Sequence, residues 1–433
     1  MRIFKRAICF VVVIILGSST ALQFHSALKK FLSPFENVNE ISPYLDGLNS
    51  VISYFAGNAR QNIFSFEPDF YRSVCQLVTS KGYPCEEHWV TTEDGFILGL
   101  QRIPHGVAGK ARASHDRPVA LLQHGLVEAS FSFVANQANE SLAFLLADAG
   151  ADVWLGNMRG NVYSENHTSL DPAGADFWDW SFEEMARYDL PAMVHFVCQQ
   201  TGQSQLFYVG HSQGAGTGFL QLSRDPGLSQ IIRHHFALAP AVKVTVTGDF
   251  GKTISDMSDY LYFLLYVFQH GPTTHVVPNL PPVLCRVIGE EHCIEFLFSL
   301  TGTNYASFNL TRLPVYLHNF PQPTSLNNLL HWFQLVKAEK FQNFDEGSPA
   351  DNLKRYGQES PPEYDLSQYD VPTTIFYGGH DNFIGVSDIL WLRDQVKQTK
   401  LVFIPQYEHQ DFVWGTDAAT YIYSHIVDAV CQR

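Results

Sequence analysis

Residues 206–220 read LFYVGHSQGAGTGFL, and this stretch decides the expected fold. Its first four residues favour a β-strand, and the small residues that end it are compatible with a helix. Between them Gly210, Ser212 and Gly214 complete the pattern G-x-S-x-G, which places a serine on a sharp turn between a strand and a helix. The two glycines fit because a side chain at either position would crowd so tight a turn. The stretch therefore predicts a strand–turn–helix unit that presents Ser212 as a nucleophile.

A serine nucleophile needs a base that takes its proton and an acid that orients the base. After a serine elbow these residues follow in the chain order Asp or Glu, then His, each in a loop after a strand. The run TTIFY at 373–377 predicts a buried strand with Asp381 just beyond it, and KLVFI at 400–404 predicts the next such strand, with His409 after it. Loops after parallel strands meet at one edge of the sheet. We therefore expect Ser212, Asp381 and His409 to converge.

Three neighbouring residues remain alternatives for the acid and the base. Asp388 follows the same strand as Asp381, and His380 adjoins Asp381 in the same loop. His425 lies in an expected C-terminal helix. The pattern favours Asp381 and His409 without excluding the others.

The reaction also needs two N–H groups that stabilise the oxyanion of the transition state. One is expected to be the backbone N–H of Gln213, the residue after the nucleophile. The other comes from the loop after an earlier strand, and VALLQ at 119–123 predicts that strand. Gly125 in the following turn lets the backbone approach the substrate, so we expect the N–H of Leu126 to be the second donor.

An ordered series of segments carries a resemblance to a known family: VTTEDGFIL (90–98), RIP (102–104), LLQHGL (121–126), GNMRGNVYS (156–164), FEEMARYDLP (182–191), the serine elbow and HQDFVWG (409–415). The series resembles the acid lipases of the gastric and lysosomal type, α/β-hydrolases that act on neutral lipids, and the resemblance covers about 67–430. The resemblance implies an α/β-hydrolase fold, in which helices flank a mostly parallel sheet and a largely helical cap or lid is inserted. It assigns the same five site residues: Ser212, Asp381, His409, Leu126 and Gln213. It also implies a disulfide in the cap between Cys285 and Cys293.

The chain departs from the family pattern at two places near the site. Ala215 and Gly216 follow the elbow where the family usually has a bulkier residue. The segment after Asp381 reads NFIG (382–385), whereas the family usually has Leu-Ala-Asp-Pro or similar. Neither change removes a catalytic atom, but both bear on the shape of the acyl pocket and hence on the preferred substrate.

Length and charge narrow the class of protein. A chain of 433 residues can form one large α/β domain with a substantial insertion. The formal net charge is −15 at pH 7 without a basic cluster, which argues against nucleic acid as a partner. No zinc-type spacing, P-loop or dinucleotide fingerprint occurs, so we expect no metal and no organic cofactor.

The N-terminus predicts a secretory signal peptide at 1–21. Three positive charges within residues 1–6 precede an apolar run at 7–16 and small residues at 17–21. The ten-residue run is too short to span a bilayer, although an uncleaved anchor remains the alternative. A secreted or lysosomal location follows, and three N-x-S/T sequons are consistent with it: Asn139, Asn166 and Asn309.

Four further cysteines bear on the disulfide pattern. Cys75 and Cys85 are close in the chain with a glycine and a proline between them, which suggests a local bridge. Cys198 lies in a helical stretch, where a buried thiol is one interpretation, and its pairing is left open. The pairing of Cys431 is left open.

The order of segments suggests five parts. Residues 22–65 form an extension, either a propeptide or interfacial anchor or a helix packed on the domain. The hydrolase core is expected at 66–242 and 371–433, with the cap at 243–370 between them. The cap contains the uncharged block YLYFLLYVF at 260–268, which is either buried core or part of a lid that exposes apolar surface on opening.

The expected activity is hydrolysis of fatty-acid esters of neutral lipids at a lipid–water interface, with peripheral and transient membrane or droplet contact. An esterase for smaller or more polar esters would use the same triad, and the large apolar cap argues against it. A non-catalytic lipid-binding protein on a lipase scaffold is the alternative from another class. Such proteins usually lose a triad residue, whereas this chain retains all three.

Overall fold

The computed structural model describes residues 67–109, 117–245, 298 and 301–431. Several expectations lie outside these residues: the signal peptide at 1–21, the extension at 22–65, the apolar block at 260–268 and the Cys285–Cys293 disulfide. Among the residues described, no helix has both the length and the apolar character needed to cross a membrane.

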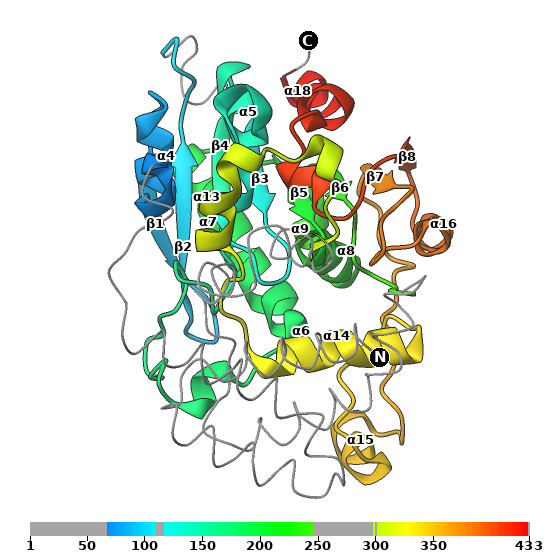
Figure 1. The fold of residues 1–433 in the computed structure, drawn as a ribbon. Helices are drawn as coiled ribbons and strands as arrows, with labels where there is room; N and C mark the ends of the chain where they lie inside the picture. The colour runs from blue at the N-terminus through cyan, green and yellow to red at the C-terminus, as the bar shows by residue number, and fades with distance from the viewer. Residues whose placement is uncertain (1–66, 110–116, 246–297, 299–300, 432–433) are drawn as a thin grey trace, which may run out of the picture.

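Within the described residues, eight strands form one sheet in the order β1-β2-β4-β3-β5-β6-β7-β8 (Figure 1). The strands are β1 (Glu86–Thr91), β2 (Ile97–Ile103), β3 (Val119–Gln123), β4 (Asp152–Gly156), β5 (Leu206–His211), β6 (Ile232–Leu238), β7 (Thr373–Gly378) and β8 (Thr399–Ile404). The pairs β1–β2 and β2–β4 are antiparallel, and every later neighbouring pair is parallel. The expected mostly parallel sheet is confirmed.

The central strands are buried along their whole length because helices cover both faces of the sheet. Every residue of β3, β4 and β5 is buried, as in other parallel sheets that are covered on both sides. The expectation of a second fully buried strand at 400–404 is wrong. β8 is the last strand in the order and is only partly covered, and its Phe403 is 48% exposed.

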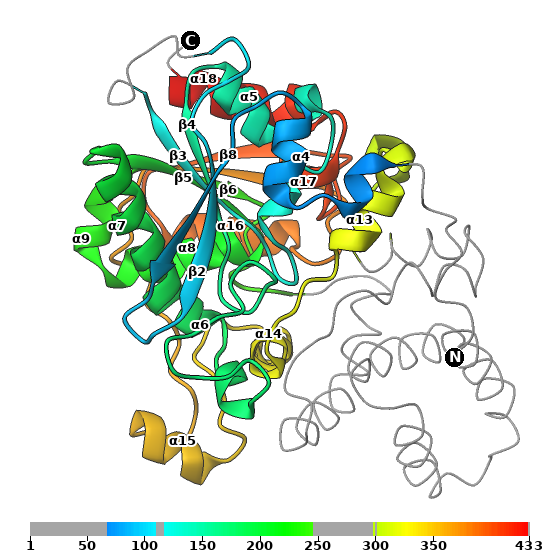
Figure 2. The same ribbon diagram turned by 90° about the vertical axis from the view of Figure 1, so that its left-hand side faces the viewer.

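Helices pack on the two faces of the sheet (Figure 2). One face carries α4 (Val74–Ser80), α5 (Leu142–Asp148), α17 (Asp411–Trp414) and α18 (Ser424–Cys431). The other face carries α6 (Phe182–Glu184), α7 (Leu190–Thr201), α8 (Gln213–Arg224), α9 (Pro226–Ile231) and α16 (Val386–Gln395). Short 3-10 or π turns complete the connections: η2 (Pro68–Tyr71), η4 (Ser130–Phe133), η5 (Ala138–Glu140), η6 (Ala175–Trp178), η7 (Met185–Asp189), η8 (Tyr305–Ser307), η9 (Leu310–Arg312) and η10 (Ala419–Tyr423).

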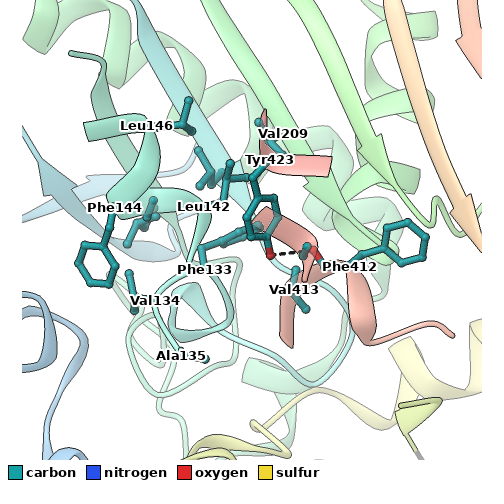
Figure 3. Close-up of a cluster of buried hydrophobic side chains, with 14 of the residues drawn as sticks. Phe133, Val134, Ala135, Leu142, Phe144, Leu146, Val209, Phe412, Val413 and Tyr423 are labelled. Atoms are coloured by element: carbon teal, nitrogen blue, oxygen red, sulfur yellow. Dashed lines mark hydrogen bonds between the residues drawn. The ribbon is translucent and has the colours of Figure 1, made fainter. Parts of the chain in front are cut away.

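The hydrophobic core on the α5 face anchors the helix that follows the predicted catalytic histidine (Figure 3). Phe133, Leu142 and Val209 pack in one cluster with Phe412 and Tyr423. The Tyr423 hydroxyl donates a hydrogen bond to the Phe412 carbonyl at 3.0 Å. Helix α17 begins only two residues after His409, so this packing limits how far the histidine loop can move.

The described chain between β6 and β7 consists of helices joined by loops. It contains α13 (Leu313–Asn319), α14 (Leu326–Ala338) and α15 (Pro349–Tyr356). Helix α14 lies against α6 (Figure 1), and the ring of Phe182 stacks on His331 with ring centroids 4.3 Å apart. Ser181 caps α6, and the Glu184 carboxylate in turn accepts the Ser181 N–H at 2.7 Å.

The local disulfide predicted near the start of the described chain is confirmed. Cys75 and Cys85 are bonded, with Cα atoms 5.3 Å apart, and the bridge ties α4 to the residue before β1. Cys198 on α7 is a free thiol and is half-buried.

Candidate active site

The elbow holds Ser212 in a strained backbone conformation between β5 and α8. Its φ is 52° and its ψ is −119°, a combination that costs a non-glycine residue about 1–3 kcal/mol. A Cβ at Gly210 would lie 2.6 Å from the Ala215 nitrogen, and one at Gly214 would lie 2.5 Å from the His124 oxygen. The two glycines therefore permit the close backbone packing that keeps the serine in this turn.

The structure brings Ser212, His409 and Asp381 together from three loops. Ser212 Oγ lies 2.8 Å from His409 Nε2, and His409 Nδ1 lies 2.9 Å from Asp381 Oδ2. The other oxygen of Asp381 accepts the backbone N–H groups of Phe383 and Ile384, both at 2.9 Å. Because the carboxylate can only accept when ionised, Nδ1 of the histidine donates to it. The lone pair on Nε2 then faces the serine hydroxyl.

These three side chains are shielded from solvent. The exposed fractions are 8% for Ser212, 8% for His409 and 6% for Asp381. The ring of Phe383 lies 5.2 Å from the ring of His409. On the insertion, Gly302 approaches the same histidine, since a Cβ there would lie 3.1 Å from His409 Cβ.

The three alternatives for acid and base lie in other surroundings. Asp388 Oδ2 accepts the backbone N–H of Thr245 at 2.8 Å and that of Gly385 at 3.2 Å, so it caps α16. His380 and His425 are exposed. Neither histidine is hydrogen-bonded to Ser212 in the part of the chain described, where His409 occupies that position.

The two expected oxyanion donors flank the serine. A Cβ at Gly125 would lie 3.0 Å from Ser212 Cβ, which shows how closely this loop approaches the nucleophile. Within the described residues, the N–H groups of Leu126 and Gln213 do not donate to a protein acceptor. An N–H that binds an oxyanion must be free in this way, so both remain candidates.

Sequence reasoning missed the hydrogen bonds between the side chain of Gln213 and helix α14. The Oε1 atom of its side chain accepts Asn328 Nδ2 at 3.0 Å and Trp332 Nε1 at 2.6 Å, both from α14. The contacts join residues more than a hundred positions apart, and no local pattern in the sequence marks them.

A buried ionic pair behind the triad was also missed. Glu128 and His211 lie side by side, with His211 Nδ1 3.2 Å from Glu128 Oε1. Burial alone would raise the pKa of Glu128, but the charge of His211 and several hydrogen bonds lower it to about 2. Burial lowers the pKa of His211, yet Glu128 raises it overall above its ordinary value. The one available signal was a single acidic residue in the apolar stretch LVEASFSF at 126–133.

The sequons lie on accessible parts of the chain. Asn139 and Asn166 are exposed, and Asn309 is partly exposed. The Oδ1 atom of Asn309 accepts the Thr311 hydroxyl at 2.7 Å, which leaves its amide nitrogen for attachment of a glycan. Glycosylation stays a prediction at all three.

Within the described residues, no three His, Cys, Asp or Glu side chains are grouped as metal ligands would be.

Known protein families and curated proteins match most of this chain. A model of the α/β hydrolase fold matches residues 118–416, and a model of a partial α/β-hydrolase lipase region matches 74–137. A gastric triacylglycerol lipase of Rattus norvegicus is 40% identical over 89% of this chain and 98% of its own length. The chain belongs to the acid lipase family of α/β-hydrolases. Two further acid lipase relatives cover most of it as well. The lysosomal acid lipase/cholesteryl ester hydrolase of Homo sapiens is 42% identical over 84% of this chain and 91% of its own, and lipase member K of Mus musculus is 40% identical over 83% and 91%.

The two departures from the acid lipase pattern have structural reasons. A Cβ at Gly216 would lie 1.9 Å from the backbone oxygen of Ala241, so α8 packs here without room for a side chain. In the segment after Asp381, Phe383 places its ring against His409. With both departures present, the contacts among Ser212, His409 and Asp381 are formed.

Proposed function

We propose that this protein is a lipase that hydrolyses carboxylic esters of neutral lipids and releases fatty acids. The observation that carries the proposal is the continuous chain from Ser212 through His409 to Asp381, with contacts of 2.8 and 2.9 Å. The substrate class rests on the relatives, which are named as a triacylglycerol lipase and a cholesteryl ester hydrolase. Triacylglycerols, cholesteryl esters or both are therefore the proposed substrates.

The reaction proceeds through a covalent acyl-enzyme. His409 Nε2 takes the proton of Ser212 as the serine oxygen attacks the ester carbonyl carbon, and the N–H groups of Leu126 and Gln213 stabilise the oxyanion. Asp381 orients the imidazole and stabilises its charged form. His409 then gives the proton to the departing alcohol as the ester bond breaks. Water, deprotonated by His409, attacks the acyl-serine and releases the fatty acid, which restores Ser212. The scheme uses no metal and no organic cofactor.

We propose further that residues 243–370 act as a cap over this site and that contact with lipid is peripheral and transient. Contacts from Gly302, Asn328 and Trp332 to the triad region support the cap. The expected signal peptide and the gastric and lysosomal names of the relatives support a secreted or lysosomal protein.

The two alternatives are weaker. An esterase for small or polar esters would share the triad, but the relatives named above are lipases. A non-catalytic lipid-binding scaffold would have no need of a serine held in a strained elbow 2.8 Å from an oriented histidine.

The test is release of fatty acid from emulsified triolein and from cholesteryl oleate between about pH 4 and 8, since the acid and base limbs of the profile report the ionisations needed for catalysis. Wild-type protein is compared with Ser212→Ala. We expect release by the wild type and its loss in the variant. Cleavage restricted to short-chain esters would favour the esterase, and lipid binding without cleavage of any ester would favour the scaffold protein.

A further inference from the structure

Glu128 is a buried carboxylate that joins three loops of the candidate site. It lies between β3 and η4, two residues after Leu126. Its Oε2 atom accepts the Gly125 N–H at 2.9 Å and the Ser132 hydroxyl at 3.0 Å. Its Oε1 atom accepts the side-chain amide of Gln410 at 2.9 Å, and His211 Nδ1 lies 3.2 Å from Oε1 and 3.3 Å from Oε2. Within the described residues four groups therefore surround this carboxylate as donors, and His211 Nδ1 lies within reach of both of its oxygens.

The partners of Glu128 come from different catalytic loops. Gly125 precedes Leu126 in the oxyanion loop, His211 precedes Ser212 in the elbow, and Gln410 follows His409. The second nitrogen of His211, Nε2, lies 3.1 Å from the backbone oxygen of His409. Both neighbours of the His211 ring, a carboxylate and a carbonyl, are acceptors, so the ring donates from both nitrogens and is an imidazolium. The Glu128–His211 pair therefore also connects the serine elbow to the loop that carries His409.

The oxyanion loop needs such an anchor because its backbone is strained. Val127 has a φ of 52°, a conformation that is an outlier for a β-branched residue. The strain lies between Leu126, whose N–H must face the oxyanion, and Glu128. The Gly125 N–H bond to Glu128 spans Leu126 and Val127 and closes the loop over them. Strained conformations of this kind persist only when surrounding contacts determine them.

We propose that Glu128 is a positioning residue. Its carboxylate holds the Leu126 N–H in the position, relative to Ser212 and His409, at which it can bind the oxyanion. The proposal rests on the proposed ester hydrolysis, since it concerns the oxyanion of that reaction. Glu128 acts through the backbone of Gly125 and the ring of His211, without touching the substrate. Its loss lowers the turnover number and leaves binding of the ester unchanged, because the oxyanion exists only in the transition state.

Two substitutions separate the hydrogen bonds of Glu128 from its bulk. Glu128→Ala leaves the Gly125 N–H, the Ser132 hydroxyl and the His211 ring without their acceptor. Glu128→Gln keeps an oxygen for Gly125 and Ser132. Its amide nitrogen can donate to a neutral His211, whose Nε2–H still reaches His409, and Gln410 can turn its amide over. The glutamine variant therefore preserves the loop while it removes the charge.

The matched control is Asp152→Ala. Asp152 is an equally buried carboxylate paired with Arg102 at 2.6 Å, and it opens β4 at the end opposite the site. All variants are assayed on p-nitrophenyl butyrate, and their active sites are counted with a fluorophosphonate. Inhibition by an alkyl trifluoromethyl ketone, which forms a bound oxyanion, is measured on the same variants. Amide hydrogen exchange of Gly125 is followed separately and does not depend on activity.

We expect kcat per active site to fall about 10²-fold in Glu128→Ala, the loss typical of one oxyanion donor, with KM unchanged. Affinity for the ketone should fall in parallel, Gly125 should exchange faster, and Glu128→Gln should recover most of kcat. Asp152→Ala should lose stability without loss of kcat. Two results would overturn the proposal. One is a folded Glu128→Ala variant with wild-type kcat, and the other is a folded Glu128→Gln variant whose kcat also falls about 10²-fold. If Glu128→Ala does not fold, the glutamine variant decides. A wild type that neither cleaves esters nor reacts at Ser212 would refute the proposed function, and Gly125 exchange would still test the anchor.

Discussion

Substitution of Gly216 by alanine tests how the elbow is supported from behind. The added Cβ would lie 1.9 Å from the Ala241 backbone oxygen, whereas real Cβ contacts essentially never fall under 3.0 Å, so the two must separate by about 1 Å. The backbones of Gly216 and Ala241 are both hydrogen-bonded to Ser212. The Ser212 carbonyl accepts the Gly216 N–H at 3.0 Å and the Ala241 N–H at 3.1 Å. The methyl group therefore displaces Ser212 itself.

The magnitude follows from opposing effects. Overpacking of this kind costs about 1–3 kcal/mol, and replacing a helical glycine by alanine returns up to about 1 kcal/mol. We expect Gly216→Ala to lose about 1–2 kcal/mol of unfolding free energy. A shift of about 1 Å in a reacting group can reduce the rate about 10²-fold, so kcat should fall by that order.

The assay combines urea unfolding with kcat on a soluble ester, normalised to active sites. The control is Gly385→Ala in the acid loop, where the nearest atoms to an added Cβ are 3.5 Å away and φ is −69°, which alanine adopts readily. The control should keep wild-type kcat. If Gly216→Ala keeps both its stability and its kcat, the packing of α8 against Ala241 does not position the serine.

Three further outcomes are expected. Asp381→Asn should keep the fold and lose about 10⁴-fold in kcat, because the amide no longer selects the histidine tautomer with a free Nε2; a loss under tenfold would return the acid role to another residue. Burial raises the pKa of Asp411 from 3.8 to about 7, despite backbone bonds from Glu408 and Asn304. The folded chain therefore binds the proton more tightly, and this stability is complete below pH 3.8 and is lost as the pH rises through about 7. The unfolding free energies of wild type and Asp411→Asn are measured from about pH 4 to 8. As the pH rises, the wild type should lose up to about 4 kcal/mol relative to the variant. Parallel curves would contradict the raised pKa of Asp411. Removing the Cys75–Cys85 bridge with paired serines should cost about 3 kcal/mol by loop entropy, and an unchanged urea midpoint would show that the bridge contributes nothing.

The elements that carry the triad could be predicted because their signals are local. The elbow glycines, the apolar runs of β3, β5 and β7, and the loops that follow them are contiguous in the chain. Parallel strands place those loops at one edge of the sheet, so convergence of Ser212, Asp381 and His409 follows from their order alone. The Cys75–Cys85 bridge was accessible for the same reason, since only nine residues separate the two cysteines.

The sequence favours Asp381 over Asp388, but only the tertiary structure gives a physical reason for that preference. Both follow β7, and composition does not distinguish them. Helix α16 begins at Val386, so Asp388 caps its own helix, while Asp381 is hydrogen-bonded to His409.

The sequence by itself determined the fold class and predicted the candidate nucleophile Ser212 and the chain order of the proposed triad, because strand patterns and turn chemistry act over a few neighbouring residues. Tertiary structure decided what surrounds them. Glu128 meets His211 across 83 positions, and Gln213 meets Trp332 across 119. Likewise β8 is an edge strand only because of the order in which the sheet assembles. A buried polar group needs partners of matching geometry, and those partners become neighbours only when distant loops pack at the same edge of the sheet.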